Sequence, residues 1–346
     1  MKKKKIAFLL PNIGRHELQF NEAEPGTIKF FFTQRNKEEI FQELRKFKRL
    51  EPLDFVCLKE FPFVGYSRGF CLGLIPRLLF GKYDIVISRC PDSFATHISF
   101  LIAKLKGIRF ILTSETWLWP NTFANKLAKP YMKYIMKNSD SVVVSSKVHK
   151  EFLLEHGVPE SRIEILERWY ETDKLPKDKL LKPRDKQKTF NILYIGRIIP
   201  YKGLKELIKI YSQFLQECPN SFLTIVGKGT SWQYDGKNPN YEQECIDLAN
   251  EILLSDKYKF YGWQDSVGNF YTEADVVVMP NVLLKDDRVP AEAFGRVLVE
   301  SLKNRTPVIA TKWIAAAYDF IKDGYNGYIV EDVFDIKEKL KEVYEK

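Results

Sequence analysis

The chain has 346 residues, 45% of them hydrophobic, which is enough for about two globular domains with cores of their own. Its five cysteines are odd in number and form no CxxC pair, and there are only four histidines, so the composition argues against a disulfide framework and a zinc site and favours a reducing compartment. The net charge of +9 comes from the first half, because residues 1–165 carry 27 Lys and Arg against 17 Asp and Glu, whereas residues 166–346 carry 27 against 28.

The start of the chain, MKKKKIAFLLPN, joins a basic segment to an apolar run at residues 6–10. That run is too short for a secretory signal core, so we expect a strand there. Since no apolar run approaches the ~20 residues that span a bilayer, no transmembrane helix is expected. The helical patterns between the strands of this half indicate a doubly wound parallel sheet. Its further strands are predicted at residues 27–32, 53–58, 83–88, 109–113, 141–146 and 161–166.

Two segments of the first half, residues 61–82 and 123–138, mix cations with aromatic and aliphatic side chains. Basic amphipathic stretches of this kind can lie in the interface of an anionic membrane. A helix that packs its apolar face on the sheet and exposes its lysines explains the same pattern equally well. No RNA-binding motif is present, so no nucleic-acid partner is expected. The second segment carries the lysines Lys126, Lys129, Lys133 and Lys137.

Composition also predicts the domain boundaries. Residues 171–188, ETDKLPKDKLLKPRDKQK, are polar and rich in lysine and proline, which is typical of an interdomain linker. The first domain then covers residues 1–170 and the second residues 189–335. Residues 336–346 have the pattern of a charged amphipathic helix.

The second half contains two glutamates, Glu292 and Glu300, separated by seven residues. The apolar spacing between them predicts a helix that begins near Gly295, with Glu292 in the loop before it and Glu300 on its second turn. Eight residues advance a helix by about 12 Å, so the two carboxylates could contact two ends of an elongated ligand. The unpaired N–H groups of the helix start between them form a ready anion site.

Three further blocks precede this motif in the chain. Residues 191–195 are predicted to be a strand that ends at Gly196-Arg197, and Lys202-Gly203 opens an amphipathic helix. FLTIVGKGT at residues 222–230 reads as a strand and a glycine loop, and KFYGW at residues 259–263 as a strand end.

Together these four blocks resemble the donor-binding domain of the GT-B glycosyltransferases, specifically the large retaining family numbered four. Its signature is a Glu–x7–Glu motif with Phe-Gly after the first glutamate. The match covers roughly residues 190–330, and the first half matches only in outline. The resemblance implies an α/β protein with two Rossmann-like, doubly wound domains that face a cleft. It also implies that the helix at 336–346 packs back on the first domain.

The resemblance assigns roles to individual residues. Arg197 and Lys202 would clamp the donor diphosphate, Glu292 would hold sugar hydroxyls, and Glu300 would accept the ribose hydroxyls. With Arg197, Lys202 and Glu292 stabilising the transition state, neither a metal nor a cofactor is expected. Further donor-binding residues are expected at Gly14, Gly196, Gly227, Lys228, Gly262, Trp263, Phe294, Gly295, Arg296, Val297 and Leu298.

The first half departs from the family pattern in two places. Many relatives have a glycine pair after the first strand, whereas this chain has only Gly14. Many place a histidine after the fifth strand, where this chain has Ser114 and Glu115. We expect Glu115 and Trp117 to contact the acceptor. Glu115 could instead bind the donor sugar, or it could equally cap the loop of Trp117.

We therefore expect a metal-independent hexosyltransferase, and the resemblance to the family implies that it retains the configuration of the transferred sugar. Its donor would be a nucleotide sugar and its acceptor a lipid-linked or cell-surface glycan. The basic first domain would bring it to the inner face of the membrane as a peripheral, cytoplasmic protein. The alternatives are a GT-B sugar-nucleotide epimerase or hydrolase and an inactive nucleotide-sugar-binding scaffold.

Overall fold

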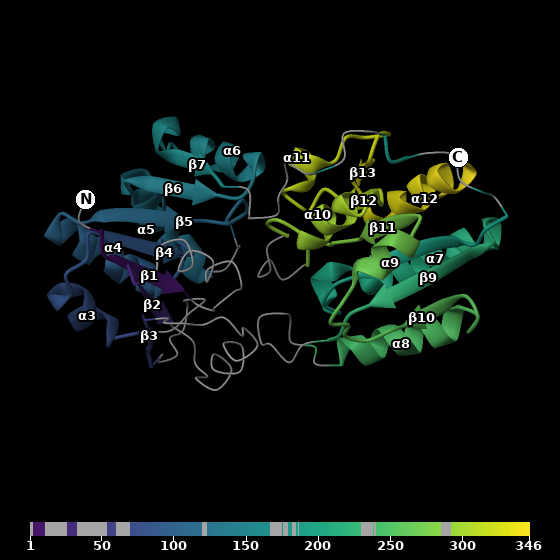
Figure 1. The fold of residues 1–346 in the computed structure, drawn as a ribbon, viewed down its shortest axis with the longest axis horizontal. Coiled ribbons are helices and arrows are strands. Elements are labelled where there is room, and N and C mark those ends of the chain that lie inside the picture. The colour runs from purple at the N-terminus through teal and green to yellow at the C-terminus, as the bar shows by residue number, and fades with distance from the viewer. Residues whose placement is uncertain are drawn as a thin grey trace. The chain divides into compact units, whose positions relative to one another are not determined.

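The structure is a computed structural model, and its residues form two compact units, drawn in Figure 1. One unit comprises Met1–Ser145 and His149–Trp169, and the other Ser146–Val148 and Tyr170–Lys346. The structure describes residues 3–10, 26–32, 54–59, 70–119, 123–166, 175, 179–181, 185, 187–229, 238, 240–284 and 292–346, with the backbone alone at 123–127.

The first unit is built on a seven-stranded parallel sheet in the order β3-β2-β1-β4-β5-β6-β7 (Figure 1). Each strand predicted in this half forms at or near its expected residues. The strands are β1 Ile6–Leu10, β2 Ile28–Phe32, β3 Asp54–Cys57, β4 Ile85–Arg89, β5 Arg109–Thr113, β6 Ser141–Val144 and β7 Ile163–Ile165. The described helices are α3 Leu74–Phe80, α4 Phe94–Lys106, α5 Phe123–Asn138, α6 Lys147–Glu155 and the 3-10 turn η1 Glu160–Arg162.

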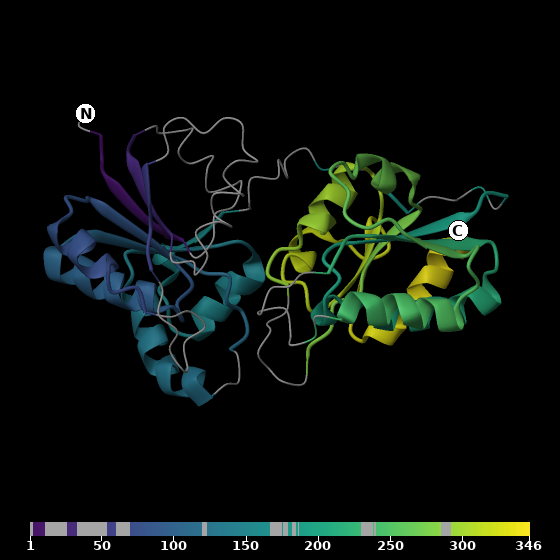
Figure 2. The same cartoon turned by 90° about the horizontal axis from the view of Figure 1, so that it is seen from below.

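Both faces of this sheet are buried. Helices α3 to α6 cover one face with a shared apolar cluster that includes Leu74, Phe100 and Leu153 (Figure 2). The opposite face carries Phe8, Phe30 and Phe32, whose rings stack in sequence at centroid distances of 5.8 and 6.2 Å. Burial on two faces explains why the strand IAFLL is a continuous apolar run and why IKFFF is apolar except at Lys29, rather than alternating.

Helix α5 divides its side chains between the core and the solvent. Met132, Ile135 and Met136 are buried in the first unit's core, whereas Tyr131 and Tyr134 are exposed. The aliphatic face of the predicted amphipathic segment therefore packs on the sheet, as in an ordinary α/β helix. The outward face keeps two tyrosines among lysines. Among the described residues no helix is both long and apolar enough to span a bilayer.

The second unit contains a six-stranded parallel sheet in the order β10-β9-β8-β11-β12-β13, the strand order typical of doubly wound nucleotide-binding domains. The strands are β8 Phe190–Ile195, β9 Ser221–Val226, β10 Tyr258–Phe260, β11 Val276–Met279, β12 Val308–Thr311 and β13 Gly327–Val330. The helices are α7 Leu204–Glu217, α8 Tyr241–Ile252, α9 Gly268–Glu273, α10 Arg296–Lys303, α11 Ala317–Phe320 and α12 Ile336–Glu345, with the 3-10 turns η3 Pro200–Lys202 and η4 Val333–Asp335.

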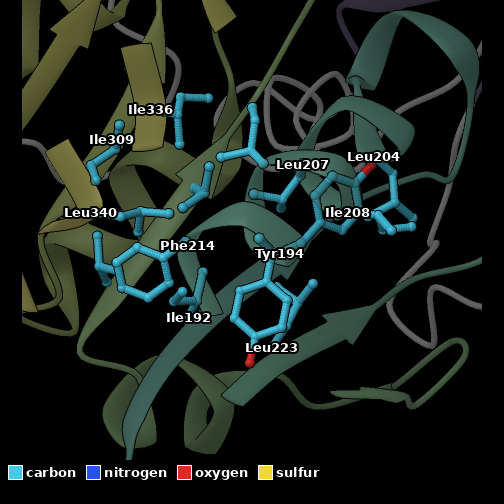
Figure 3. Packing of buried hydrophobic residues seen from close by; sticks show 14 of the residues in the cluster. Ile192, Tyr194, Leu204, Leu207, Ile208, Phe214, Leu223, Ile309, Ile336 and Leu340 are labelled. Atoms are coloured by element: carbon cyan, nitrogen blue, oxygen red, sulfur yellow. The ribbon is translucent and has the colours of Figure 1, made fainter. Parts of the chain in front are cut away.

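Helices lie on both faces of this sheet (Figure 2). Side chains of α7, α8 and α12 form one apolar cluster with the sheet, and side chains of α9, α10 and α11 form another. Figure 3 shows the first cluster, in which residues of β8, α7, β9, β12 and α12 interdigitate. The labelled residues are Ile192, Tyr194, Leu204, Leu207, Ile208, Phe214, Leu223, Ile309, Ile336 and Leu340.

The position of α12 corrects an expectation. Its buried residues Ile336, Leu340 and Val343 belong to the core of the second unit. Lys337 on α12 also forms an ion pair of 3.0 Å with Glu217 of α7. The helix was expected to pack on the first domain, and that prediction is wrong, because its apolar stripe is used inside the second unit.

The end of the predicted linker also belongs to the second unit. Leu180 and Leu181 are buried in its two clusters, and both of their N–H groups donate to the carbonyl of Tyr325, at 2.9 and 3.1 Å. Most of residues 171–188 lie outside the described residues.

The order of the second sheet creates a switch point between β8 and β11. The chain leaves β8 toward α7 on one face, and after β11 it reaches α10 on the other. Connections that part in this way open a crevice at the carboxyl ends of the two strands, where ligands of doubly wound sheets bind.

Replacement of Leu340 by Ala should test the placement of α12. Leu340 is fully buried, so we expect a loss of about 2–5 kcal/mol in the free energy of unfolding, measured with urea. The control Leu254→Ala, at a position that is 65% exposed, should change it by no more than about 0.5 kcal/mol. An unchanged midpoint for Leu340→Ala would mean that α12 packs elsewhere.

Candidate functional site

A close backbone contact brings the two sides of the switch point together. Gly203 has a positive φ of 69°, and a Cβ built on it would lie 1.8 Å from the carbonyl oxygen of Pro280. No other residue fits, since the clash is with backbone. Val282 N–H donates to the carbonyl of Tyr201 at 2.9 Å and ties the same two segments. The loop after β8 is thus fixed against the loop after β11.

The contact sets Lys202 beside Glu292. Lys202 Nζ lies 2.6 Å from Glu292 Oε2, and the side chains are only 14% and 22% exposed. The second carboxylate oxygen, Oε1, accepts the N–H of Gly295 at 3.1 Å. The structure therefore joins the predicted diphosphate clamp to the first glutamate of the Glu–x7–Glu motif, across 90 residues of sequence.

The pKa of Glu292 is lowered by this environment. Burial alone would raise it, but the positive charge and hydrogen bond of Lys202 outweigh burial, and Arg197 and the Gly295 N–H add to the lowering. Glu292 is therefore a carboxylate at neutral pH, which suits it to accept hydrogen bonds and not to donate a proton.

The main chain of Glu292 is held as firmly as its side chain. Its N–H donates to the carbonyl of Trp313 at 2.8 Å, and its carbonyl accepts the N–H of Ala315 at 2.9 Å. These bonds form an isolated parallel bridge between Glu292 and Ile314, beyond the end of β12. Helix α10 begins at Arg296 with Gly295 as its N-cap, as the sequence predicts.

Arg197 is oriented by tyrosines that the sequence analysis did not single out. Its Nη2 donates to the hydroxyl of Tyr201 at 2.7 Å, and its carbonyl accepts the hydroxyl of Tyr194 at 2.9 Å. Tyr201 also places its ring 5.5 Å from Lys202 Nζ. The sequence offered one indication of this role: Tyr201 lies four residues after Arg197 and next to Lys202.

Glu300 lies on the second turn of α10, where it was predicted. Its Oε2 accepts the hydroxyl of Tyr271 at 2.9 Å, and Arg296 Nη2 lies 3.6 Å from its Oε1. Burial and the neighbouring Glu300 charge raise the pKa of Tyr271, so the phenol remains a donor at all ordinary pH values. Tyr271 belongs to α9 and was missed because it is distant in sequence.

Glycines from three strand ends meet beside Arg197. Ile198 N–H donates to the carbonyl of Lys228, and Gly227 N–H donates to the carbonyl of Gly262. A Cβ on Gly227 would lie 1.8 Å from the carbonyl oxygen of Gly196, so these loops approach closely. Trp263 follows Gly262 and is 70% exposed, so this aromatic residue is accessible to a planar ligand.

Two predicted donor-binding residues have packing roles instead. The side chains of Phe294 and Leu298 are buried in the core under α10, and the Leu298 N–H donates to the carbonyl of Gly295 at 2.9 Å. Their side chains are therefore not available to a ligand. Arg296 is exposed and Val297 half-buried at the start of the helix. Gly14 lies outside the described residues.

The predicted acceptor residues lie in the first unit, after β5. Arg89 Nη2 donates to Glu115 Oε1 at 3.0 Å, so an ion pair joins the carboxyl ends of β4 and β5. His149 Nε2 donates to the carbonyl of Glu115 at 3.0 Å, and burial lowers the pKa of His149 to about 4, which keeps it neutral. The indole N–H of Trp117 is buried and has no partner among the described residues.

The described residues contain no group of three or more His, Cys, Asp or Glu side chains that could hold a metal ion. Cationic groups instead line the carboxyl edge of the second sheet, where Arg197 and Lys202 stand beside the start of α10. Such an arrangement can bind an anion, and Glu292 and Glu300 can accept hydrogen bonds from hydroxyl groups on either side of it.

Two family models match the chain. The one described as "Glycosyl transferases group 1" matches residues 177–346, and "Glycosyltransferase Family 4" matches residues 30–174. An uncharacterized glycosyltransferase of Methanocaldococcus jannaschii is 27% identical over 72% of this chain and 74% of its own length. The lipopolysaccharide 1,2-N-acetylglucosaminetransferase of Salmonella typhimurium is 29% identical over 55% of this chain, which spans about half (49%) of that relative.

Solved structures share the fold. The crystal structure of HepE from Anabaena in complex with UDP has a TM-score of 0.73 at 16% identity, over 98% of this chain and 89% of that one. The lipopolysaccharide outer core galactosyltransferase WaaB in its apo form has a TM-score of 0.63 at 17% identity, over 98% and 90%. At these identities the likeness establishes a GT-B fold.

Replacement of Glu292 by Gln should reveal the lowered pKa. The substitution removes the negative charge of Glu292 and leaves the mostly buried Lys202 without its ionic partner. We therefore expect the free energy of unfolding to fall by about 1–3 kcal/mol at pH 7. Because the folded pKa lies below the unfolded one, the difference between wild type and variant should be complete above about pH 5 and shrink as pH falls through the folded pKa. Urea midpoints at pH 7, 5 and 3.5 measure it.

The control for this series is Glu160→Gln, which breaks the exposed ion pair with Lys150 and should move the midpoint little at any of these pH values. A difference for Glu292→Gln that grows on acidification would contradict the direction of its pKa shift.

Proposed function

The chain belongs to the GT-B glycosyltransferases of the family-4 type, and from this premise we propose that it transfers a hexose from a nucleotide-diphosphate sugar to a glycan acceptor with retention of configuration. The observation that carries the proposal is the Lys202–Glu292 ion pair at the switch point of the second sheet, with the Gly295 N–H on the same carboxylate. It supplies a cation for a diphosphate and a carboxylate for a sugar at one place.

The charge of the nucleoside diphosphate leaving group explains why Arg197 and Lys202 would be needed at the site. A nucleoside diphosphate carries about two negative charges, and more charge develops on the bridging oxygen as the bond to the sugar breaks. Arg197 offers two parallel N–H donors and Lys202 a point charge, and the N–H groups that begin α10 add a partial positive charge. These groups can stabilise the departing diphosphate without a metal, which is the basis for proposing a metal-independent reaction.

The two glutamates have separate tasks in this proposal. Glu292, ionised and held by Lys202, accepts hydrogen bonds from hydroxyls of the transferred sugar and does not act as nucleophile. Glu300, at the far end of the motif, accepts the hydroxyls of the ribose. Gly262 and the exposed Trp263, which follow β10, receive the base. Lys228 and the glycines Gly196 and Gly227 line the approach to the phosphates.

Relatives support a cell-envelope acceptor. One relative is a lipopolysaccharide 1,2-N-acetylglucosaminetransferase, and another is a capsular polysaccharide biosynthesis glycosyltransferase of Staphylococcus aureus that is 25% identical over 62% of this chain. We therefore propose a lipid-linked or surface glycan as acceptor, bound by the first unit near Glu115 and Trp117. The reaction would take place at the cytoplasmic face of the membrane, with the protein attached peripherally.

The outward face of α5 supports the membrane part of the proposal. Tyr131 and Tyr134 are exposed there, 38% and 55%, among Lys133 and Lys137. Tyrosines prefer the interface between lipid and water, and lysines are attracted to anionic lipid. The segment at residues 61–82 is described only from residue 70 onward.

Donor binding is tested first with a panel of nucleotide sugars, by following the release of nucleoside diphosphate with and without a lipid-linked acceptor. Glu300→Ala should then weaken binding of the active nucleoside diphosphate by about 1.5–3 kcal/mol, since it removes charge-assisted hydrogen bonds. Calorimetry measures the affinity. Equal affinity for wild type and variant would defeat the ribose assignment, and release without any acceptor dependence would favour a hydrolase.

Membrane attachment is tested with liposomes that contain anionic lipid. Each lysine near such a surface contributes roughly 1 kcal/mol, and the attraction falls off within about 8 Å at physiological salt. We expect co-sedimentation of the wild type to be lost when four lysines of α5 are changed to Gln together, whereas donor binding should persist. The four are Lys126, Lys129, Lys133 and Lys137.

A matched control changes four lysines of the second unit to Gln and should leave co-sedimentation intact. These are Lys209, Lys259, Lys303 and Lys322. Wild-type protein that ignores anionic liposomes even at low salt would overturn the membrane proposal and leave the lysines of α5 as an ordinary solvated face.

A further inference from the structure

One buried tyrosine contacts the site from a different helix. Tyr271 of α9 is 1% exposed, and its hydroxyl donates to Glu300 Oε2 at 2.9 Å across 29 residues of sequence. Its ring lies in the apolar cluster under α10, where the ring of a phenylalanine would fill the same space. The hydroxyl is therefore not needed for packing and requires a partner of its own.

The main chain of Tyr271 is anchored to the far end of α10. Thr306 Oγ donates to the carbonyl of Tyr271 at 2.6 Å, and Thr306 N–H donates to the carbonyl of Ser301 at 3.0 Å. Ser301 Oγ returns a bond to the carbonyl of Thr306 at 2.9 Å. Helix α9 is thus fixed to α10, and the phenol is held at the level of Glu300.

Glu300 needs such a restraint if it is to recognise a ligand. Its side chain is 30% exposed and has several rotatable bonds, so ordering it on binding would cost free energy. The other neighbour, Arg296, is 3.6 Å away and 60% exposed, which makes it a weak restraint. The phenol uses one of about four acceptor positions of the carboxylate and leaves the others to a ligand.

We propose that Tyr271 is a positioning residue that orients the Glu300 carboxylate toward the two hydroxyls of a ribose and thereby makes the site prefer ribonucleotide over 2′-deoxyribonucleotide donors. The inference rests on the proposed function, because it assigns the ribose to Glu300. Tyr271 acts through Glu300 and does not touch the ligand. A site that has lost the phenol still has its carboxylate, but the carboxylate is no longer held in one orientation.

The test measures the ratio of two dissociation constants by calorimetry, for a ribonucleoside diphosphate and its 2′-deoxy counterpart. The probes are UDP, GDP and ADP, each with its deoxy analogue, and the pair that wild type binds most tightly is used. Tyr271→Phe should lower the preference for ribose by about fivefold or more, within the range that a hydrogen bond to a charged group supports. Glu300→Gln should lower it at least as far.

Two further variants separate positioning from packing. Tyr211→Phe removes another fully buried hydroxyl, which donates to the carbonyl of Lys257 at 3.0 Å, and should leave the ratio unchanged. The double variant Tyr271→Phe with Glu300→Gln should have the ratio of Glu300→Gln alone, because the two residues act as a unit. If Tyr271→Phe fails to fold, Thr306→Val, which loosens the anchor of Tyr271, should lower the ratio in the same direction.

The outcomes distinguish the inference from the proposed function. If Glu300→Gln lowers the preference for ribose but Tyr271→Phe does not, the positioning role is overturned and the ribose assignment stands. A ratio that Glu300→Gln does not change, or a wild type that binds none of the three diphosphates, would overturn the ribose assignment and the inference with it.

Discussion

The ion pair between Lys202 and Glu292 depends on a contact that contains no side chain of either residue. Gly203 can lie against the carbonyl of Pro280 only because it has no Cβ, and this approach brings the loop after β8 to the loop after β11. A larger residue at 203 would move the lysine away from its carboxylate. The same approach fixes the loop that carries Arg197 and Tyr201, since both precede Lys202 after β8.

Both units are built on a parallel sheet, but their charged side chains are arranged differently. In the second unit, Lys202 pairs with Glu292, Arg197 donates to the Tyr201 hydroxyl, and Glu300 accepts the Tyr271 hydroxyl. The first unit carries the excess of positive charge and a smaller polar cluster around Arg89 and Glu115. The two units therefore differ in charge and in the polar contacts at their strand ends.

The sequence was informative where the signal is local. Apolar runs predict the strands, and Gly295 predicts the start of α10, because burial and backbone freedom act on neighbouring residues. Tyr201 and Tyr271 could not be found in this way, since their hydroxyls matter only through partners that the fold brings to them. The prediction of where α12 packs failed for a related reason. An amphipathic stripe shows that a helix packs on a core, but not on which sheet.

The bridge between Glu292 and Ile314 has a consequence for how a ligand is received. Because both main-chain groups of Glu292 are bonded to the segment after β12, its carboxylate belongs to the rigid part of the second unit. Such a group is preorganised: it loses little conformational entropy when a ligand binds to it, and more of the contact free energy remains as affinity. The adjustment on binding would then fall to the long side chains of Lys202 and Arg197, which can exchange partners without any movement of the sheet.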